Sequence, residues 1–267
     1  MTKELSSRLA AEVNDVTITA SDGTVLRAWD LRPQRGNADA VILLHGLSDN
    51  RRGMIGYAEL LLKHGYSVLM PDARAHGASG GGIATYGLLE RDDIRQWFEW
   101  LTHNDQPRCI FGFAESMGAA ELLQALQVEP HFCAVAAESP FADFREIAYD
   151  RMGQFFHTGP WLGRTLLRPI VEMALLYTRW KYGFDLQQAS PENSVAPTPV
   201  PVFLIHGAMD SNIAVRHSRL IANRNRNIVL WEVANSDHCG AISTAPSEFE
   251  KRLIIWFETH TAPVQPE

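Results

Sequence analysis

The chain has 267 residues, of which 46% are hydrophobic, so it can bury one large core, and a single domain over 1–267 is favoured over two small ones. Its formal net charge is −7 and its basic residues are scattered, which argues against a nucleic-acid partner. No window reaches the ~20 apolar residues of a membrane span, so we expect no integral membrane segment in this chain.

The first residues, MTKELSSRLAAEVNDV, lack the apolar segment of a secretory signal. The three cysteines, Cys109, Cys133 and Cys239, have no metal-ligand spacing, and their odd number argues against a disulfide framework. We therefore expect no metal site and a reducing, cytoplasmic location. An upstream anchor or signal lost from the N-terminus would also be compatible with this sequence.

Two short runs, 16–19 and 24–31, flank the sequence SDGT, and Asp22-Gly23 between them predicts the turn of an antiparallel hairpin. Six further runs are apolar or β-branched and end in turn-forming residues, which is typical of buried strands. These runs are AVILLHG (40–46), YSVLMPD (66–72), RCIFGF (108–113), FCAVAAES (132–139), PVFLIHG (201–207) and IVLWEVAN (228–235).

Stretches with helical periodicity separate most of these strands. They cover 55–64, 88–102, 119–126, 214–223 and 247–259. This alternation predicts an α/β fold with a mostly parallel central sheet, an antiparallel N-terminal hairpin and helices on both faces. The ligands of such a sheet bind at the carboxyl ends of its strands, so we expect the chemistry there.

Residues 141–185 interrupt the alternation because they contain no strand pattern. Two amphipathic helical stretches, DFREIAYDRMGQFF and WLGRTLLRPIVEMALLYTRWKY, are rich in aromatic and long aliphatic residues. This composition predicts a small helical cap inserted at about 141–185, and we expect Phe155 and Trp161 to face a substrate pocket. An ordinary surface helix pair packed on the sheet is the alternative.

Two serines compete for the role of nucleophile. Ser79, in HGASGG, matches the written elbow pattern Gly-x-Ser-x-Gly in full, but the glycines that follow it predict a flexible loop instead of a helix. Ser116, in FGFAESMGAA, has Ala114 in place of the first glycine. A strand precedes Ser116 and a helical stretch with small residues follows it, which is the context that an elbow requires, so Ser116 is the predicted nucleophile.

A serine hydroxyl needs a base to take its proton and an acid to orient that base. The predicted base is His238, in NSDHCGA, because it follows the last strand and should lie over the carboxyl edge of the sheet. The predicted acid is Asp210, which comes three residues after His206-Gly207 and so reaches the same edge. His45 and His206 precede glycines at strand ends, where a turn or a supporting role is expected.

Other carboxylates compete with Asp210. Glu138 and Asp143 follow the strand FCAVAAES, and Asp237 adjoins His238 but is poorly placed to reach its imidazole. An oxyanion hole would complete the site. We expect its donors to be the backbone N–H of Met117, at the start of the elbow helix, and that of Leu47, in the turn after AVILLHG.

Five segments together resemble the α/β-hydrolase superfamily along nearly the whole chain. They are HGLSDN (45–50), PDARAHGASGG (71–81), AESMGAA (114–120), HGAMD (206–210) and SDHCGA (236–241). Within that superfamily the chain looks most like bacterial hydrolases related to serine aminopeptidases and prolyl oligopeptidases. The resemblance implies the fold, the order nucleophile, acid, base and acyl transfer to water, but no particular substrate, since similar proteins include esterases, thioesterases and peptidases.

The sequence therefore predicts a cofactor-independent serine hydrolase. Its expected substrate is a small molecule, a carboxylic ester of a small or medium apolar acyl group that is cleaved through an acyl-enzyme intermediate. A peptidase or thioesterase with the same triad is the alternative enzyme. A noncatalytic binding protein of the same fold is the alternative from another class.

Overall fold

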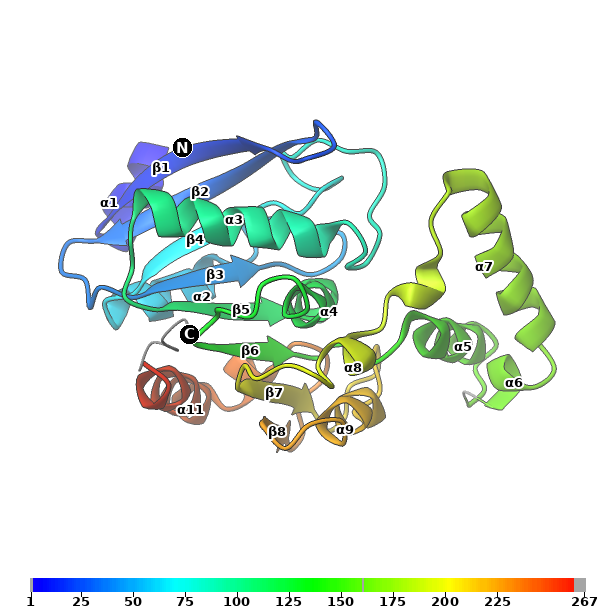
Figure 1. The fold of residues 1–267 in the computed structure, drawn as a ribbon. Helices are drawn as coiled ribbons and strands as arrows, with labels where there is room; N and C mark the ends of the chain where they lie inside the picture. Colours follow the sequence, from blue (N-terminus) through cyan, green and yellow to red (C-terminus); the bar gives the residue numbers. More distant parts are fainter. Residues whose placement is uncertain (1, 160, 262–267) are drawn as a thin grey trace.

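The computed structural model describes residues 2–159 and 161–261, and its strands form one sheet of eight (Figure 1). The order across the sheet is β1-β2-β4-β3-β5-β6-β7-β8. The strands are β1 (Ala11–Thr19), β2 (Val25–Pro33), β3 (Ala40–Leu44), β4 (Ser67–Pro71), β5 (Ile110–Glu115), β6 (Ala134–Glu138), β7 (Val202–Gly207) and β8 (Ile228–Val233). Strand β2 runs antiparallel to both of its neighbours, and all other pairs are parallel. The predicted fold class is confirmed.

Helices cover both faces of this sheet because successive side chains of each buried strand point to opposite faces. In β3, Val41 and Leu43 join one apolar cluster and Ile42 and Leu44 join the other. The first cluster includes side chains of α1 (Thr2–Leu9), α2 (Ile55–Lys63), α10 (Ala241–Thr244) and α11 (Pro246–Thr259). The second includes side chains of α3 (Glu90–Asn104), α4 (Ser116–Ala125) and α9 (Arg216–Ala222).

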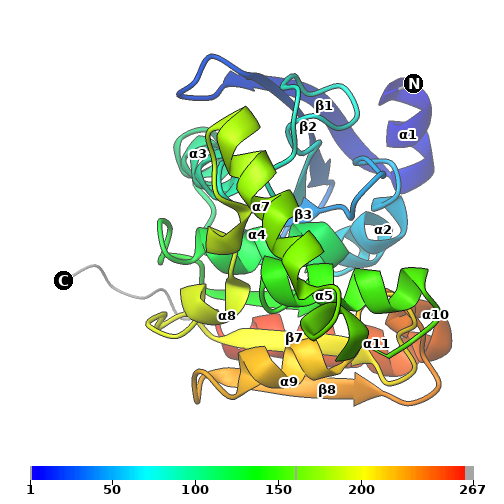
Figure 2. The ribbon, with the colours of Figure 1, turned by 90° about the vertical axis from the view of Figure 1, so that its right-hand side faces the viewer.

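The segment between β6 and β7 begins with three helices that lie across the carboxyl ends of the strands (Figure 2). We call them the cap helices: α5 (Phe144–Phe155), α6 (Trp161–Arg164) and α7 (Arg168–Tyr182). The sequence suggested a single helical stretch over 161–182, but the helix breaks before α7. Pro169 lies in the first turn of α7, where its missing N–H and fixed φ are tolerated, whereas it would disrupt the interior of a longer helix.

A short 3₁₀ helix, Leu186–Gln188, and helix α8 (Pro191–Ser194) lead from the cap back to β7. At the N-terminus, α1 is a helix that the sequence analysis did not identify. Strand β1 also begins earlier than expected, because its alternating exposed residues belong to a half-solvated edge strand and not to an apolar run. Among the described helices, none is long and apolar enough to cross a membrane.

The cysteines differ from expectation. Cys109 and Cys133 immediately precede the neighbouring parallel strands β5 and β6, and their sulfur atoms form a disulfide, while Cys239 is free. The expectation of no disulfide is therefore wrong. An odd number of cysteines does not show which strands are adjacent, and adjacency decides this pair. The cysteines therefore no longer support the expectation of a reducing compartment.

Candidate active site

A sharp turn joins β5 to α4, and Ser116 occupies it with φ +53. This left-handed backbone is uncommon for a residue with a side chain and is the strained geometry of a nucleophile elbow. A Cβ on Gly118 would lie 2.5 Å from the carbonyl oxygen of His45, so α4 can cross β3 only with glycine at that position. Ala114 is fully buried among apolar side chains within β5, where its methyl group is accommodated.

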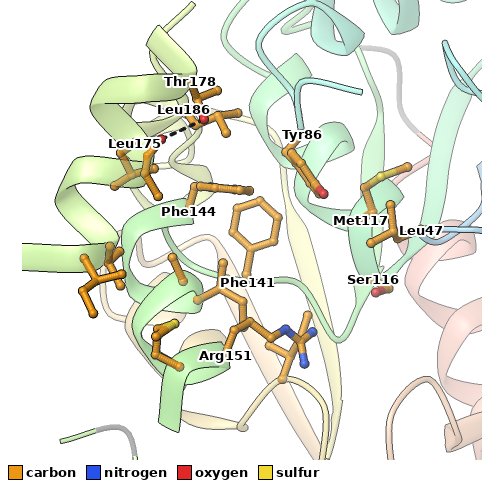
Figure 3. A pocket seen from close by; sticks show the side chains of 17 residues that line it. Leu47, Tyr86, Ser116, Met117, Phe141, Phe144, Arg151, Leu175, Thr178 and Leu186 are labelled. Atoms are coloured by element: carbon orange, nitrogen blue, oxygen red, sulfur yellow. Dashed lines mark hydrogen bonds between the residues drawn. The ribbon is translucent and has the colours of Figure 1, made fainter. Parts of the chain in front are cut away.

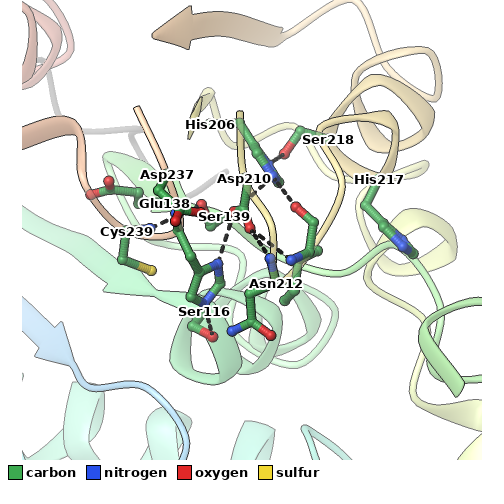
Figure 4. Close-up of polar contacts among 12 residues, drawn as sticks. Ser116, Glu138, Ser139, His206, Asp210, Asn212, His217, Ser218, Asp237 and Cys239 are labelled. Carbon is green, nitrogen blue, oxygen red and sulfur yellow. Dashed lines mark hydrogen bonds and ion pairs between the residues drawn. The ribbon is translucent and has the colours of Figure 1, made fainter. Parts of the chain in front are cut away.

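His238 contacts both Ser116 and Asp210 (Figure 4). Its Nε2 lies 2.9 Å from Oγ of Ser116, and its Nδ1 lies 2.8 Å from Oδ2 of Asp210. The three residues come from the turns that follow β5, β7 and β8, so parallel strand ends bring them to one edge of the sheet. The structure thus brings together the three residues that the sequence predicts as nucleophile, acid and base.

The carboxylate of Asp210 is held in an environment that keeps it ionised. Burial raises its pKa, but hydrogen bonds from His206 and His238 outweigh burial, and the pKa lies well below its usual value. The N–H groups of Asn212 and Ile213 also donate to Oδ1, at 2.9 and 2.7 Å. An ionised acceptor at Nδ1 of His238 favours the tautomer whose free Nε2 can accept the proton of Ser116.

The rival carboxylates are engaged elsewhere. Glu138 is fully buried and accepts bonds from the Tyr57 hydroxyl at 3.3 Å and from the backbone of Ala241 at 2.9 Å. Asp143 caps the first turn of α5. Asp237 accepts the N–H of Ser211 at 2.8 Å and so fastens the loop that carries Asp210.

Ser79 and His45 have structural contacts. The hydroxyl of Ser79 donates to the carbonyl of Asp72 at 2.7 Å and accepts the N–H of Arg27 at 2.9 Å, which ties the glycine-rich loop to β2. Nε2 of His45 accepts the N–H of Ala73 at 3.1 Å, and its Nδ1 donates to the carbonyl of Gly46 at 2.8 Å. Both side chains hold loops in place.

Ser116 lies on the wall of a cavity of about 430 Å³ between the sheet edge and the cap helices (Figure 3). Most of the wall is apolar. The lining residues are Leu47, Tyr86, Ser116, Met117, Phe141, Phe144, Ile147, Ala148, Arg151, Met152, Ile170, Val171, Ala174, Leu175, Thr178, Leu186 and Ile213. An apolar cavity with few polar groups is typical of a site for a small apolar ligand.

Leu47 and Met117 lie beside Ser116 in this cavity. Met117 is in the first turn of α4, where backbone N–H groups have no acceptor within the helix. The loop after β3 passes close to the serine, since a Cβ on Gly46 would lie 3.3 Å from Cβ of Ser116. The two backbone segments that the sequence suggested as oxyanion donors therefore lie close to Ser116.

The expectation that Phe155 and Trp161 face the pocket is wrong. Their side chains are 76% and 61% exposed, and neither lines the cavity. On α5 the lining residues recur with helical spacing from Phe144 to Met152, and Phe155 lies one turn beyond, where the helix has passed the cavity. In α6, Gly163 packs against the backbone of Tyr149, and Trp161 is left at the surface.

Aromatic residues from outside the cap helices form part of the wall instead. Tyr86 and Phe141 were not identified from the sequence because they lie in loops with no periodicity. Arg151 was also missed, although its spacing from Phe144 and Ile147 places all three on one face of a helix.

The chain matches the model of a known protein family. The model of the alpha/beta hydrolase family matches residues 41–252. The chain belongs to this family. The match runs from β3 into α11 and includes Ser116, Asp210 and His238.

Relatives of this alpha/beta hydrolase include one with a named activity. An esterase of Pyrococcus furiosus, Pf2001, is 28% identical and superposes with a TM-score of 0.75 over 95% of each chain. YqkD of Bacillus subtilis, an uncharacterized protein, is 27% identical over 227 residues, which cover 83% of this chain and 71% of YqkD. YfhR of Escherichia coli K12, also uncharacterized, is 26% identical over 254 residues, 91% of this chain and 79% of YfhR.

Proposed function

We propose that the protein is a serine hydrolase that cleaves carboxylic esters of apolar acyl groups. The observation that carries this proposal is the chain of contacts from Asp210 through His238 to Ser116 on the wall of an apolar cavity. The similar Pf2001 protein of Pyrococcus furiosus is an esterase, which favours esters as the substrate class. Residues 141–185 would act as the cap over the acyl group.

In the first half of the reaction, Oγ of Ser116 attacks the ester carbonyl carbon while Nε2 of His238 takes the hydroxyl proton. The ionised Asp210 stabilises the resulting imidazolium. The N–H groups of Met117 and Leu47 would hold the oxyanion. When the C–O bond to the alcohol breaks, His238 gives its proton to the departing oxygen, and the acyl group stays on Ser116.

In the second half, water attacks the acyl-enzyme and gives its proton to His238. The bond between the acyl carbon and Oγ then breaks, and the proton returns to Ser116 as the carboxylic acid leaves. The reaction uses these side chains, two backbone N–H groups and water. The same steps would serve a thioester or an amide, so the leaving group must be tested directly.

The test is covalent labelling with a fluorophosphonate probe, combined with ester, thioester and amide substrates of matched acyl length. Ser116→Ala should abolish labelling and lower kcat on the best ester by roughly 10³-fold or more. Ser79→Ala is the matched control and should keep both, because the hydroxyl of Ser79 bonds to the backbone of Asp72 and Arg27 and not to His238. Full activity in Ser116→Ala would exclude the proposed mechanism, and no labelling of the wild type would favour a noncatalytic protein.

A further inference from the structure

One charged side chain interrupts the apolar wall of the cavity. Among the described residues that line it, Arg151 on α5 alone carries a charge. Figure 3 shows its guanidinium group extending toward the part of the cavity that holds Ser116, whereas Leu175, Thr178 and Leu186 lie at the other end. A positive charge therefore lies on the side of the cavity that holds Ser116.

Nearby arginines are paired with carboxylates. Nε of Arg145 lies 3.4 Å from Oε1 of Glu172, and Nη2 of Arg216 lies 2.5 Å from Oδ1 of Asp150. Arg164 forms an ion pair with Glu146. These contacts hold the cap helices to each other and to α9.

Arg151 differs from these neighbours. In the part of the chain that the structure describes, its Nη1 donates to Oε1 of Gln154 at 2.8 Å, and no carboxylate forms an ion pair with it. Gln154 donates to the carbonyls of Ser211 and Asn212, at 3.2 and 2.9 Å, which places this pair beside the loop of Asp210. Arg151 also lines the cavity and is exposed to solvent, so its other N–H donors are accessible to a ligand.

The side chain of Arg151 lines the cavity but is exposed to solvent, so water hydrates its guanidinium in the empty site. Partial burial, the largest contribution, lowers the pKa of Arg151, and the negative charge of Asp210 offsets part of that effect. Asp210 is bonded to His238 and is not available as a partner. A guanidinium in this position would gain most from a ligand with a carboxylate or phosphate, whose paired oxygens match its parallel N–H groups.

We propose that Arg151 binds an anionic group on the alcohol part of the substrate. The acyl chain would occupy the apolar end of the cavity, so the group beside Ser116 and Arg151 is the alcohol. The preferred substrates are then esters of an apolar acid with an alcohol that carries a carboxylate or phosphate. This inference rests on the proposed function, because it assigns the substrate class of the same site.

The experiment compares three hexanoate esters that differ only in the alcohol: ethanol, glycolate and 2-phosphoethanol. Release of hexanoate is followed by pH-stat titration with the purified full-length protein. We expect kcat/KM for at least one anionic ester to exceed that for the ethyl ester by about tenfold or more, and the two anionic arms to distinguish carboxylate from phosphate. Arg151→Met should abolish this preference for the anionic ester, and Arg151→Lys should keep part of it.

Arg168→Met is the matched control. It removes the same charge from α7, where the side chain is 61% exposed and does not line the cavity, so it should leave the ratio unchanged. Equal hydrolysis of the three esters by the wild type, or equal effects of the two arginine variants, would overturn the inference. If the ethyl ester is cleaved in a Ser116-dependent way without any preference, this inference alone fails. If no ester is cleaved and Ser116 is not labelled, the proposed function fails with it.

Discussion

Nε2 of His206 lies 3.2 Å from Oδ2 of Asp210, the same carboxylate oxygen that contacts His238. His206 is fully buried, and Ser218 Oγ lies 2.7 Å from its Nδ1. Nε2 also lies 2.7 Å from the carbonyl oxygen of Ile213, so it faces two acceptors and carries the ring proton. Nδ1 is then unprotonated and accepts the hydrogen bond of the Ser218 hydroxyl. Two imidazoles thus share one carboxylate, and His206 holds Asp210 in place from a buried position outside the cavity lining.

This arrangement predicts a shift in the pH profile. Removing the bond from His206, as in His206→Leu, should raise the pKa of Asp210 from its lowered value, because that bond favours the ionised form. A more basic carboxylate stabilises the imidazolium of His238 in the free enzyme, so the acid limb of kcat/KM should move upward by about one pH unit. His206→Gln keeps a donor and should move it less. A lower rate with the same midpoint would show that His206 acts only through packing.

Replacing each of the two candidate acids, Asp210 and Glu138, by its amide should have very different effects on activity. Asp210→Asn should lower kcat by roughly 10³ to 10⁴-fold, because the imidazole loses the acceptor that fixes its tautomer. Glu138→Gln should change kcat much less, since Glu138 contacts Tyr57 and Ala241 instead of His238. Circular dichroism and thermal melts would show that both variants fold. The reverse order of effects would place the acid at the end of β6.

Glu138 should make stability depend on pH. Burial is the largest contribution, and it raises the pKa of this carboxyl from 4.5 to about 7. Below pH 4.5 both states are protonated. As pH rises from 4.5 to 7, the unfolded chain loses this proton first, so the folded state loses stability on the order of 3 kcal/mol.

The glutamine in Glu138→Gln cannot lose a proton, so this pH-dependent loss of stability should be absent from the variant. The free energy of unfolding of the variant, relative to that of the wild type, should therefore increase on the order of 3 kcal/mol as pH rises from 5 to 8. Urea titrations at the two pH values measure the difference directly. Parallel pH dependence in the two proteins would mean that Glu138 does not titrate abnormally.

The cavity predicts which cap positions control acyl length. Ala174 on α7 lines the cavity, so Ala174→Phe should fill part of it and lower kcat/KM for long acyl esters, relative to short ones, by about tenfold. Phe155→Ala and Trp161→Ala change exposed side chains outside the cavity and should leave the ratio unchanged. A changed chain-length profile in those two variants, with none in Ala174→Phe, would move the acyl site to the outer side of the cap.

The sheet and the residues at its carboxyl edge could be predicted because both follow from patterns within short stretches of sequence. Buried parallel strands are continuous apolar runs, and each turn that carries Ser116, Asp210 or His238 directly follows such a run. The full motif at Ser79 predicts a loop for a local reason, since three glycines start a helix poorly, and the structure has no helix there. Sequence position relative to strands was therefore more informative than the written motif.

The composition of the cap predicted that helices would be present, but it did not predict which of their residues face the cavity. An apolar residue in a cap helix can face the cavity or solvent, and the choice depends on where the helix lies over the sheet. Phe144 and Phe155 occupy the same helical face, yet only Phe144 is within reach of the cavity. The pairing of Cys109 with Cys133 likewise follows from the adjacency of β5 and β6, which the chain order alone does not reveal.

The close crossing of α4 over β3 has a consequence for how this protein can evolve. At position 118 every amino acid other than glycine would bring a Cβ into backbone atoms of His45, which cannot rotate away as a side chain can. At position 114 the surroundings already accept a methyl group. Mutational drift should therefore leave Gly118 fixed while position 114 alternates between glycine and alanine, so searches of genomes that demand both glycines would pass over sequences like this one.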